Sequence, residues 1–291
     1  MALNFSTAAA ICERLGLDSS QVQTRAVGGG DIAQASLIQA AGQTVFIKTL
    51  ALEHAGLLVA EADGLAALRA AAAVRVPQVR GCGEAENLAW LALEGLDLQS
   101  RSGQADARLG RQLADLHRRT GDRFGWQADN YIGLTPQLNT PADDWAAFFG
   151  DRRLGYQMER LARNRPEALS SGLIDRALRR WEQLAADHQP AVSLLHGDLW
   201  SGNAGALADH EPVIFDPAVH YGDRECDLAM SALFGGFSAA FYRSYETAWP
   251  LPAGWEARRS WYRLYHLLNH ANLFGGGYLS RARHELAALI G

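Results

Sequence analysis

The spacing of apolar residues changes about one third of the way along the chain. Before Glu94, short runs of β-branched and aromatic residues stand between glycine-containing turns, as in a small sheet. One longer stretch instead carries leucines three and four positions apart, which is typical of a helix. A short helix is expected after Asn4, ending at Gly16. The pattern predicts strands over 32–39, 44–48 and 88–93, a helix over 53–73, and turns over 28–30, 41–43 and 81–86.

After Glu94 the apolar residues recur at helical spacing almost to the end of the chain. We expect helices over 103–120, within 143–189 with a break near 166–173, and from 226 onward with loops at 249–254 and 275–277. The length of 291 residues suffices for two domains. The pattern therefore predicts an α+β protein with a small β-rich N-lobe, residues 1–94, and a larger, mainly helical C-lobe, residues 95–291.

Composition and charge exclude several classes of protein. A hydrophobic content of 48% with 20% charged residues is ordinary for a globular chain with a large core. The net charge of −5 and the absence of a basic run argue against nucleic acid as a partner. No apolar run reaches the ~18 residues that span a membrane. The three cysteines, Cys12, Cys82 and Cys226, form no CxxC pair, which favours the reducing cytoplasm. No obligate protein partner is evident.

The segment Leu194–Asn203 carries the strongest chemical signal. It contains the order His-x-Asp-x-x-x-x-Asn, and the apolar run Val213–Phe215 then leads to Asp216. A kinase needs an aspartate that takes or orients the acceptor hydroxyl proton, here Asp198. It also needs oxygen ligands for the magnesium ion on ATP, here Asn203 and Asp216. Each motif alone is a common turn or strand end, but the two together in this order predict phosphoryl transfer.

Residues of the first third would hold the nucleotide. Lys48 interrupts an apolar strand and would reach the α- and β-phosphates, with Glu61 of the next helix as its ion-pair partner. A strand-end lysine is otherwise a surface charge, so this prediction depends on the downstream motif. Gly28, Gly29 and Gly30 would form a loop over the phosphates, although this is not a GxGxxG motif and a flexible turn remains the alternative.

The kinase interpretation assigns roles to six further residues. The segment Glu94, Gly95 and Leu96 would form the hinge between the lobes, with the Glu94 carbonyl and the Leu96 N–H on adenine. Asp227 begins a predicted helix and would either cap it or brace the catalytic loop through backbone N–H groups, together with His196 as structural support. Trp200 lies between Asp198 and Asn203 and is expected in the acceptor pocket.

The string Leu-Leu-His-Gly-Asp-Leu-Trp-Ser-Gly-Asn resembles the signature of the fructosamine kinase (ketosamine kinase) family, a branch of the aminoglycoside and choline kinase-like fold. Further matches lie at 28–32, 46–48, 61–65, 129–133, 144–149 and 221–225, with Asp227. The resemblance implies a bilobal protein-kinase-like fold and ATP-dependent phosphorylation of a sugar hydroxyl on a ketoamine, free or on a glycated protein. The phosphorylated adduct then breaks down and releases the amine. Asn130 and Tyr131 would join Trp200 at the substrate.

The chain also departs from related patterns. Some family members carry a cysteine in the glycine-rich loop with proposed redox control, whereas Asp31 stands here, so we expect no thiol switch. The arginine of the protein-kinase His-Arg-Asp motif is Gly197, and Asp216-Pro217-Ala218 replaces Asp-Phe-Gly. Control by a phosphorylated activation loop should therefore be absent.

Two other functions remain as alternatives. The first is an aminoglycoside or choline-like phosphotransferase. Its substrates are cationic, as ketoamines are, so an acidic acceptor site with Asp223 and Glu225 would not discriminate, while Trp200 and residues 130–133 favour the ketoamine. The second is a nucleotide-binding pseudokinase module, against which the intact Lys48, Asp198, Asn203 and Asp216 argue. The sequence leaves open which ketose is preferred and whether the adduct is free or protein-bound.

Overall fold

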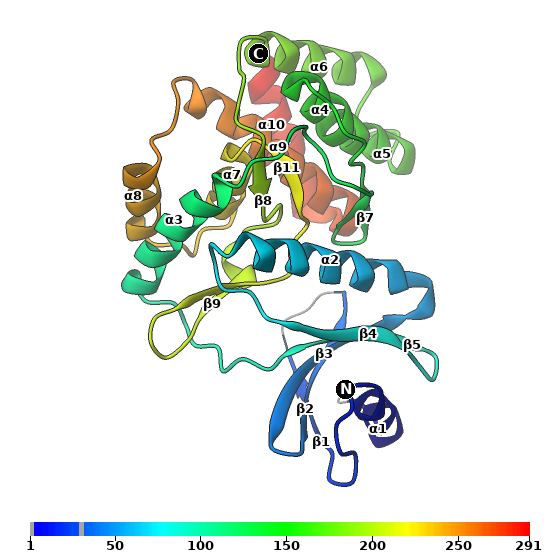
Figure 1. Ribbon diagram of the computed structural model, residues 1–291. Helices are drawn as coiled ribbons and strands as arrows, with labels where there is room; N and C mark the ends of the chain where they lie inside the picture. The colour runs from blue at the N-terminus through cyan, green and yellow to red at the C-terminus, as the bar shows by residue number, and fades with distance from the viewer. Residues whose placement is uncertain (1–2, 29–31) are drawn as a thin grey trace. The chain divides into compact units, whose positions relative to one another are not determined.

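The computed structural model describes residues 3–28 and 32–291, and its backbone contacts divide into two compact units. Unit 1 comprises Met1–Ala105 and Ala204–Pro217, and unit 2 comprises Asp106–Asn203 and Ala218–Gly291. Figure 1 traces the elements of both units along the chain. Unit 1 is rich in strands and unit 2 in helices, so the predicted α+β class is confirmed.

Unit 1 is built on a five-stranded antiparallel sheet with the strand order β1-β2-β3-β5-β4. Its strands are β1 (Gln23–Val27), β2 (Gln34–Ala40), β3 (Gln43–Ala51), β4 (Val79–Ala85) and β5 (Leu88–Glu94). β2, β3 and β5 lie where strands are predicted. The β2–β3 turn places Ala41 and Gly42 at φ 49° and 74°, the left-handed conformation that suits a two-residue hairpin.

Helices α1 (Phe5–Arg14) and α2 (Ala55–Ala71) cover opposite faces of this sheet (Figure 1). Successive side chains of a strand point to opposite faces. Ile47 of β3 is buried in the apolar cluster that includes α1 residues, and the next residue, Lys48, pairs with Glu61 of α2. The alternation along β3 therefore delivers the lysine to the α2 face.

Strand β4 was not predicted. The segment 81–86 was expected to hold a turn; a turn does begin at Glu86, but the residues before it, Val79–Ala85, pair with β5 as a strand. Glycine weakens a strand signal because it has no side chain to pack. Here a Cβ on Gly83 would come within 3.1 Å of the Trp90 ring on β5. The glycines make room for a neighbouring indole, which a local sequence pattern does not reveal.

Unit 1 also contains a hairpin from much later in the chain. Strands β9 (Ala204–Ala206) and β10 (Pro212–Ile214) pair with each other, and single bridges join them to Gln99 and Arg75. The observed division thus differs from a boundary at Glu94, since residues 95–105 and this hairpin group with the sheet. Pairing between distant segments leaves no trace in local periodicity.

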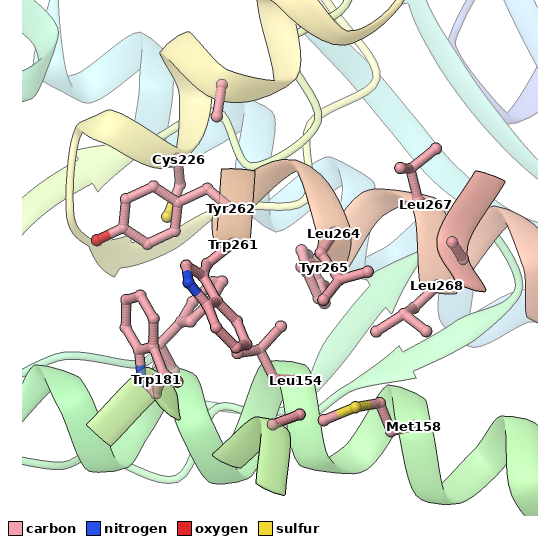
Figure 2. Close-up of a cluster of buried hydrophobic side chains, with 14 of the residues drawn as sticks. Leu154, Met158, Trp181, Cys226, Trp261, Tyr262, Leu264, Tyr265, Leu267 and Leu268 are labelled. Carbon is pink, nitrogen blue, oxygen red and sulfur yellow. The ribbon is translucent and has the colours of Figure 1, made fainter. Parts of the chain in front are cut away.

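Unit 2 is mainly helical around one large apolar core. Its central helix is α9 (Trp255–Phe274), which contacts α5, α7 and α10. Figure 2 shows Tyr265 and Leu268 of α9 close to Leu154 and Met158. The other helices are α3 (Gly103–His117), which begins at the unit boundary, α4 (Trp145–Phe149), η2 (Gly150–Gly155), α5 (Tyr156–Asn164), α6 (Ser171–Ala185), α7 (Glu225–Leu233), α8 (Ala239–Ala248) and α10 (Gly276–Ile290).

Two short strand pairs complete unit 2. β8 (Ser193–Leu195) pairs with β11 (His220–Gly222), and β6 (Asn130–Ile132) pairs with β7 (Thr135–Gln137). β8 ends where the predicted catalytic loop begins, and α7 begins shortly after β11. The loop and the helix that carries Asp227 therefore start from adjacent strands.

Within the described residues, none of the helices combines the length and the apolar character needed to cross a bilayer. The longest of them, α9 at 20 residues, carries Glu256, Arg258, Arg259 and Arg263.

Candidate active site

The loop after β8 depends on a glycine at position 197. Gly197 has φ 85°, a conformation that side-chain-bearing residues rarely adopt. A Cβ there would also overlap the carbonyl oxygen of Ala218. Ala218 lies close because its N–H donates to the His196 carbonyl at 2.8 Å. The absence of arginine from the His-x-Asp motif thus has a local steric cause.

Asp227 fixes the backbone of the predicted catalytic loop. Its two carboxylate oxygens accept the backbone N–H groups of His196 and Gly197, both at 2.8 Å. This is the bracing role predicted for Asp227. The residue lies in the first turn of α7 but does not cap the helix, because the N-cap residue is Arg224. Burial works to raise the pKa of the Asp227 carboxyl, but the hydrogen bond and charge of His117 and the loop N–H groups hold it below its ordinary value.

His117 is a supporting residue that sequence analysis missed. Its Nε2 lies 3.2 Å from Asp227 Oδ2, and its Nδ1 lies 2.8 Å from the hydroxyl of Tyr245. The side chain is fully buried. The available signal was a polar residue on the apolar face of α3, since buried polar groups need partners. The partner residues, 110 and 128 positions away, could not be read from that face.

Asn203 orients Asp198 within unit 2. The amide nitrogen Nδ2 of Asn203 donates to the backbone oxygen of Asp198 at 2.9 Å and to its Oδ2 at 3.3 Å. The Asp198 N–H points to Nδ1 of the buried His196, 3.2 Å away. The short helix η3 (Ser201–Asn203) turns the chain back, which brings the two ends of the motif together. The half-buried Asp198 carboxylate is therefore held in position by its own loop.

Trp200 stands at the edge of this loop. Its side chain is 37% exposed. The ring lies over Gly202, where an added Cβ would overlap it, and makes an edge contact with Phe234 at a centroid distance of 6.3 Å. The indole is thus fixed against glycine and phenylalanine while one part of it stays open to solvent.

In unit 1, Lys48 joins two carboxylates. Its Nζ lies 2.8 Å from Glu61 Oε1, the pairing predicted from sequence, and also bonds to Asp216. Burial works to lower the pKa of Lys48, but the two carboxylates raise it above its ordinary value. Burial, opposed by Lys48 and reinforced by Asp216, raises the pKa of Glu61 to about 7. The structure brings together three of the predicted residues as one ionic cluster.

Asp216 has an unusual backbone. It follows β10 and has φ 57°, in the left-handed region that few residues other than glycine adopt. Aspartate tolerates this region better than bulky residues do, and such strain concentrates at functional positions. The side chain is 41% exposed although Lys48 bonds to it.

The predicted hinge is held by its neighbours. Both carboxylate oxygens of Glu94 accept hydrogen bonds from Arg75 Nη2, each at 2.6 Å. Burial works to raise the pKa of Glu94, and the Arg75 bonds lower it below its ordinary value. The Gly95 N–H donates to the Thr44 carbonyl, and a Cβ on Gly95 would come within 2.6 Å of that oxygen. The side chain of Glu94 is thus structural, which leaves main-chain groups for any adenine contact.

The glycine loop can be described only in part. Gly28 follows β1 and is exposed. Gly29, Gly30 and Asp31 lie outside the described residues.

Asn130 does not have the role expected of it. Its Nδ2 donates to the Val219 carbonyl at 2.7 Å, and its Oδ1 accepts from Gln137 and Asn139, each at 2.8 Å. The side chain is buried, so it is taken up by protein groups rather than offered to a substrate. It joins the β6–β7 hairpin to the segment before β11. Tyr131 is half-buried on the same hairpin.

Asp223 and Glu225 do not form an acidic acceptor site either. Asp223 Oδ2 accepts from the Tyr262 hydroxyl at 2.7 Å and contacts His188 Nε2 at 2.6 Å. Glu225 is fully buried in a two-bond pair with Arg258. Buried carboxylates need such partners. These residues stabilise the start of α7, so they cannot supply the acidic surface considered from the sequence.

Comparison with known proteins decides the family. A sequence model described as fructosamine kinase matches residues 4–291. The chain belongs to the fructosamine kinase family. A Synechocystis protein named probable ketoamine kinase is 44% identical to the present fructosamine kinase family member. The alignment covers 91% of the present chain and 89% of the Synechocystis protein. An Arabidopsis thaliana protein named protein-ribulosamine 3-kinase, chloroplastic, is 41% identical, over 88% of the chain and 79% of its own length.

Solved structures agree with the fructosamine kinase assignment. A Haemophilus somnus 129PT protein assigned as a fructosamine-3-kinase superposes with a TM-score of 0.87 at 29% identity, covering 98% of this chain and 96% of that one. The aminoglycoside phosphotransferase APH(4)-Ia superposes with a TM-score of 0.64 at 16% identity, covering 98% and 97%. The latter likeness concerns the fold alone, and it confirms the predicted kinase-like fold.

Proposed function

We propose that this protein is an ATP-dependent ketoamine kinase that phosphorylates a sugar hydroxyl of a glycated amine. The observation that carries the proposal is the loop in which Asn203 Nδ2 bonds Asp198 while Asp227 holds the backbone beneath it. Asp198 is thus a carboxylate fixed by its neighbours yet only half-buried. Family membership adds the acceptor class.

Asp198 acts on the acceptor hydroxyl. In the proposed reaction the hydroxyl oxygen bonds to the γ-phosphorus of ATP, and the bond from that phosphorus to the β,γ-bridging oxygen breaks. ADP leaves, and Asp198 takes the hydroxyl proton. The bonds from Asn203 hold the carboxylate in one orientation, which lowers the entropic cost of aligning the hydroxyl.

Asn203 and Asp216 are the proposed magnesium ligands. Amide and carboxylate oxygens are the ligands that this hard cation prefers. Asp216 is partly exposed and already accepts a cation, since Lys48 bonds to it. When bound, magnesium would neutralise charge on the phosphates. Lys48 would then bind the α- and β-phosphates, with Glu61 keeping the ammonium in place.

The nucleotide and acceptor contacts complete the proposal. The Glu94 carbonyl and Leu96 N–H would bind the adenine edge, and the segment Gly28–Gly30 would lie over the phosphates. Trp200 and Tyr131 would line the acceptor pocket. The name of the Arabidopsis relative specifies a ribulosamine and the 3-position, so we propose the hydroxyl on the third sugar carbon. The acceptor is a small ketoamine or a glycated protein. The free thiols of Cys12, Cys82 and Cys226 suit the proposed cytoplasmic location.

ADP release tests this function directly. Ribulosyl-lysine, fructosyl-lysine, kanamycin and choline are offered with ATP and magnesium, and the phosphorylated carbon is located by NMR. We expect a ketoamine to exceed kanamycin and choline in kcat/KM by at least about tenfold, with phosphate on carbon 3. Preference for kanamycin or choline would instead establish the aminoglycoside or choline kinase alternative. A nucleotide-induced thermal shift without ADP release from any acceptor would indicate a pseudokinase.

A further inference from the structure

Five rings of unit 2 form a continuous aromatic row that starts at the catalytic loop. Trp200 contacts Phe234 at 6.3 Å between centroids, and Phe234 contacts His270 at 5.0 Å and Tyr278 at 6.3 Å. Phe274 closes the row against His270 at 5.8 Å and Tyr278 at 6.0 Å. The rings come from the loop, the end of α7, the last turns of α9 and the start of α10.

The aromatic row runs from the edge of the buried core, where Phe234 and Tyr278 pack against the core cluster, out to solvent. Trp200 and Phe274 are 37% and 50% exposed, and the three rings between them are half-buried. The large rings of the core, such as Trp145 and Trp181, are almost completely buried. Contiguous exposed aromatic surface is a feature of binding sites. An isolated exposed ring needs no such explanation, and Phe5, 62% exposed in unit 1, serves as the comparison.

The position of the aromatic row fits the second half of a ketoamine. Trp200 is two residues from Asp198, and the backbone N–H of Trp200 donates to the Asp198 carbonyl at 3.1 Å, which keeps the two residues in one tight turn. A sugar hydroxyl at Asp198 would therefore place the amine nitrogen, three carbons away, near the indole. That nitrogen is a secondary ammonium, which an aromatic face attracts. The stem of a lysine side chain spans about 6 Å when extended, similar to the Trp200–Phe234 separation of 6.3 Å.

We propose that the aromatic row is the subsite for the amine side of the acceptor, a conclusion that rests on the proposed ketoamine kinase function. Trp200 faces the ammonium, Phe234 packs on the methylenes of a lysine stem, and Phe274 with Tyr278 contacts the peptide beyond. The row thereby selects ketoamines on lysine side chains over ketoamines on small amines. Phe234, His270, Phe274 and Tyr278 determine this specificity without contacting the reacting atoms.

Two acceptors with the same ketose separate this subsite from the sugar site. One carries ribulose on methylamine and the other on Nε of N-acetyl-lysine amide. We expect the wild type to prefer the lysine compound, and Phe274→Ala and Phe234→Leu to lower its kcat/KM about five- to tenfold. Values for the methylamine compound and the KM for ATP should stay within about twofold. Phe5→Ala, the matched exposed-ring control, should change neither acceptor.

The outcomes separate the two proposals. If both ketoamines are turned over but neither variant alters their ratio, the subsite is refuted while the kinase function stands. Equal losses of kcat/KM on both acceptors would indicate that the rings only pack the structure. Phe274 is exposed, so Phe274→Ala should fold normally, and a loss in this variant cannot be attributed to misfolding. If Phe274→Ala instead dissociates a dimer in sedimentation with the acceptor ratio unchanged, the row is an interface between copies. If the wild type phosphorylates neither ketoamine, the proposed function fails as well.

Discussion

The two units hold the carboxylates of their candidate site residues with different kinds of partner, a charged side chain in unit 1 and backbone N–H groups in unit 2. In unit 1, Glu61 and Asp216 share one buried ammonium, that of Lys48. In unit 2, Asp227 is bound by the backbone N–H groups of His196 and Gly197 and by the side chain of His117. Ionic partners can be exchanged when a charged ligand binds, whereas backbone bonds fix a loop permanently. We therefore expect nucleotide binding to rearrange the ion pairs of Lys48 in unit 1 and to leave the loop held by Asp227 in unit 2 unchanged.

The largest effect is expected at the group that the rigid loop presents. Asp198→Asn should lower kcat by about 10²- to 10⁴-fold, the usual effect of losing a general base, while ATP binding survives. Steady-state ADP release and a nucleotide titration measure the two quantities. Asp175→Asn, on the exposed face of α6, is the control and should behave as wild type. Turnover within threefold of wild type would refute the role of Asp198.

Breaking the brace should affect stability and rate together. Asp227→Asn replaces one acceptor oxygen with an NH₂ group that faces a buried N–H, so we expect a loss of about 3 kcal/mol in the free energy of unfolding. Urea unfolding measures it, and kcat should fall because the loop loses its fixed position. A variant with wild-type stability but reduced kcat would contradict the structural assignment of Asp227.

Removing Asp216 from the ionic cluster that it forms with Lys48 and Glu61 should weaken magnesium-dependent binding of ATP. Asp216→Ala removes a proposed magnesium ligand, and we expect the affinity for ATP in the presence of magnesium to fall about 30-fold, ~2 kcal/mol. Calorimetric titration with and without magnesium measures this. Because Lys48 keeps Glu61 as a partner, stability should change little. Overlaid magnesium titrations of variant and wild type would exclude Asp216 as a ligand.

A smaller effect is expected at Trp200. Its side chain is partly exposed and packs on Gly202 and Phe234, so Trp200→Ala should leave the Tm and the ATP affinity nearly unchanged. The kcat/KM for the ketoamine should fall at least about tenfold, ~1.4 kcal/mol of transition-state binding. Equal losses for ATP and ketoamine would favour a role in packing the loop.

The smallest effect concerns Glu61 and pH. Its pKa is raised to about 7 in the folded protein, so the stability it contributes is present at low pH and is lost as the pH rises through that value. Glu61→Gln lacks this titration. The variant should therefore gain about 1 kcal/mol relative to wild type between about pH 6 and about pH 8. Thermal unfolding of both proteins across this range measures the difference, and a constant difference would show that Glu61 stays ionised throughout.

Candidate site residues could be predicted from their neighbours in the sequence, whereas the distant residues that hold them in place could not. Lys48 interrupts an apolar strand, and Asp198 with Asn203 sits in one short loop, so each could be recognised from its neighbours. The bonds of Asp227 to His117 join segments 110 residues apart, and Asn130 is saturated by groups 7, 9 and 89 residues away. Whether a polar side chain faces a ligand or the core depends on such partners, and periodicity contains no information about them.

The secondary structure was likewise predicted where it depends on local pattern and missed where it depends on distant partners. Apolar alternation located β2, β3 and β5, but β4 was hidden by glycines that accommodate Trp90. The grouping of residues 204–217 with unit 1 depends on single bridges to Gln99 and Arg75. Helices with a long apolar face, such as α3 and α6, were found because their pattern repeats over several turns.

The hairpin of residues 204–217 has a consequence for folding on the ribosome. The sheet of unit 1 is fully synthesised once Glu94 has emerged, so the Lys48–Glu61 pair can form early. Asp216 follows Lys48 by 168 residues, and most of unit 2 is translated in between. Closing so long a loop is entropically slow. We therefore expect nascent unit 1 to persist with an incomplete charge cluster until Asp216 arrives and completes it, at a point when residues 218–291 of unit 2 remain to be translated.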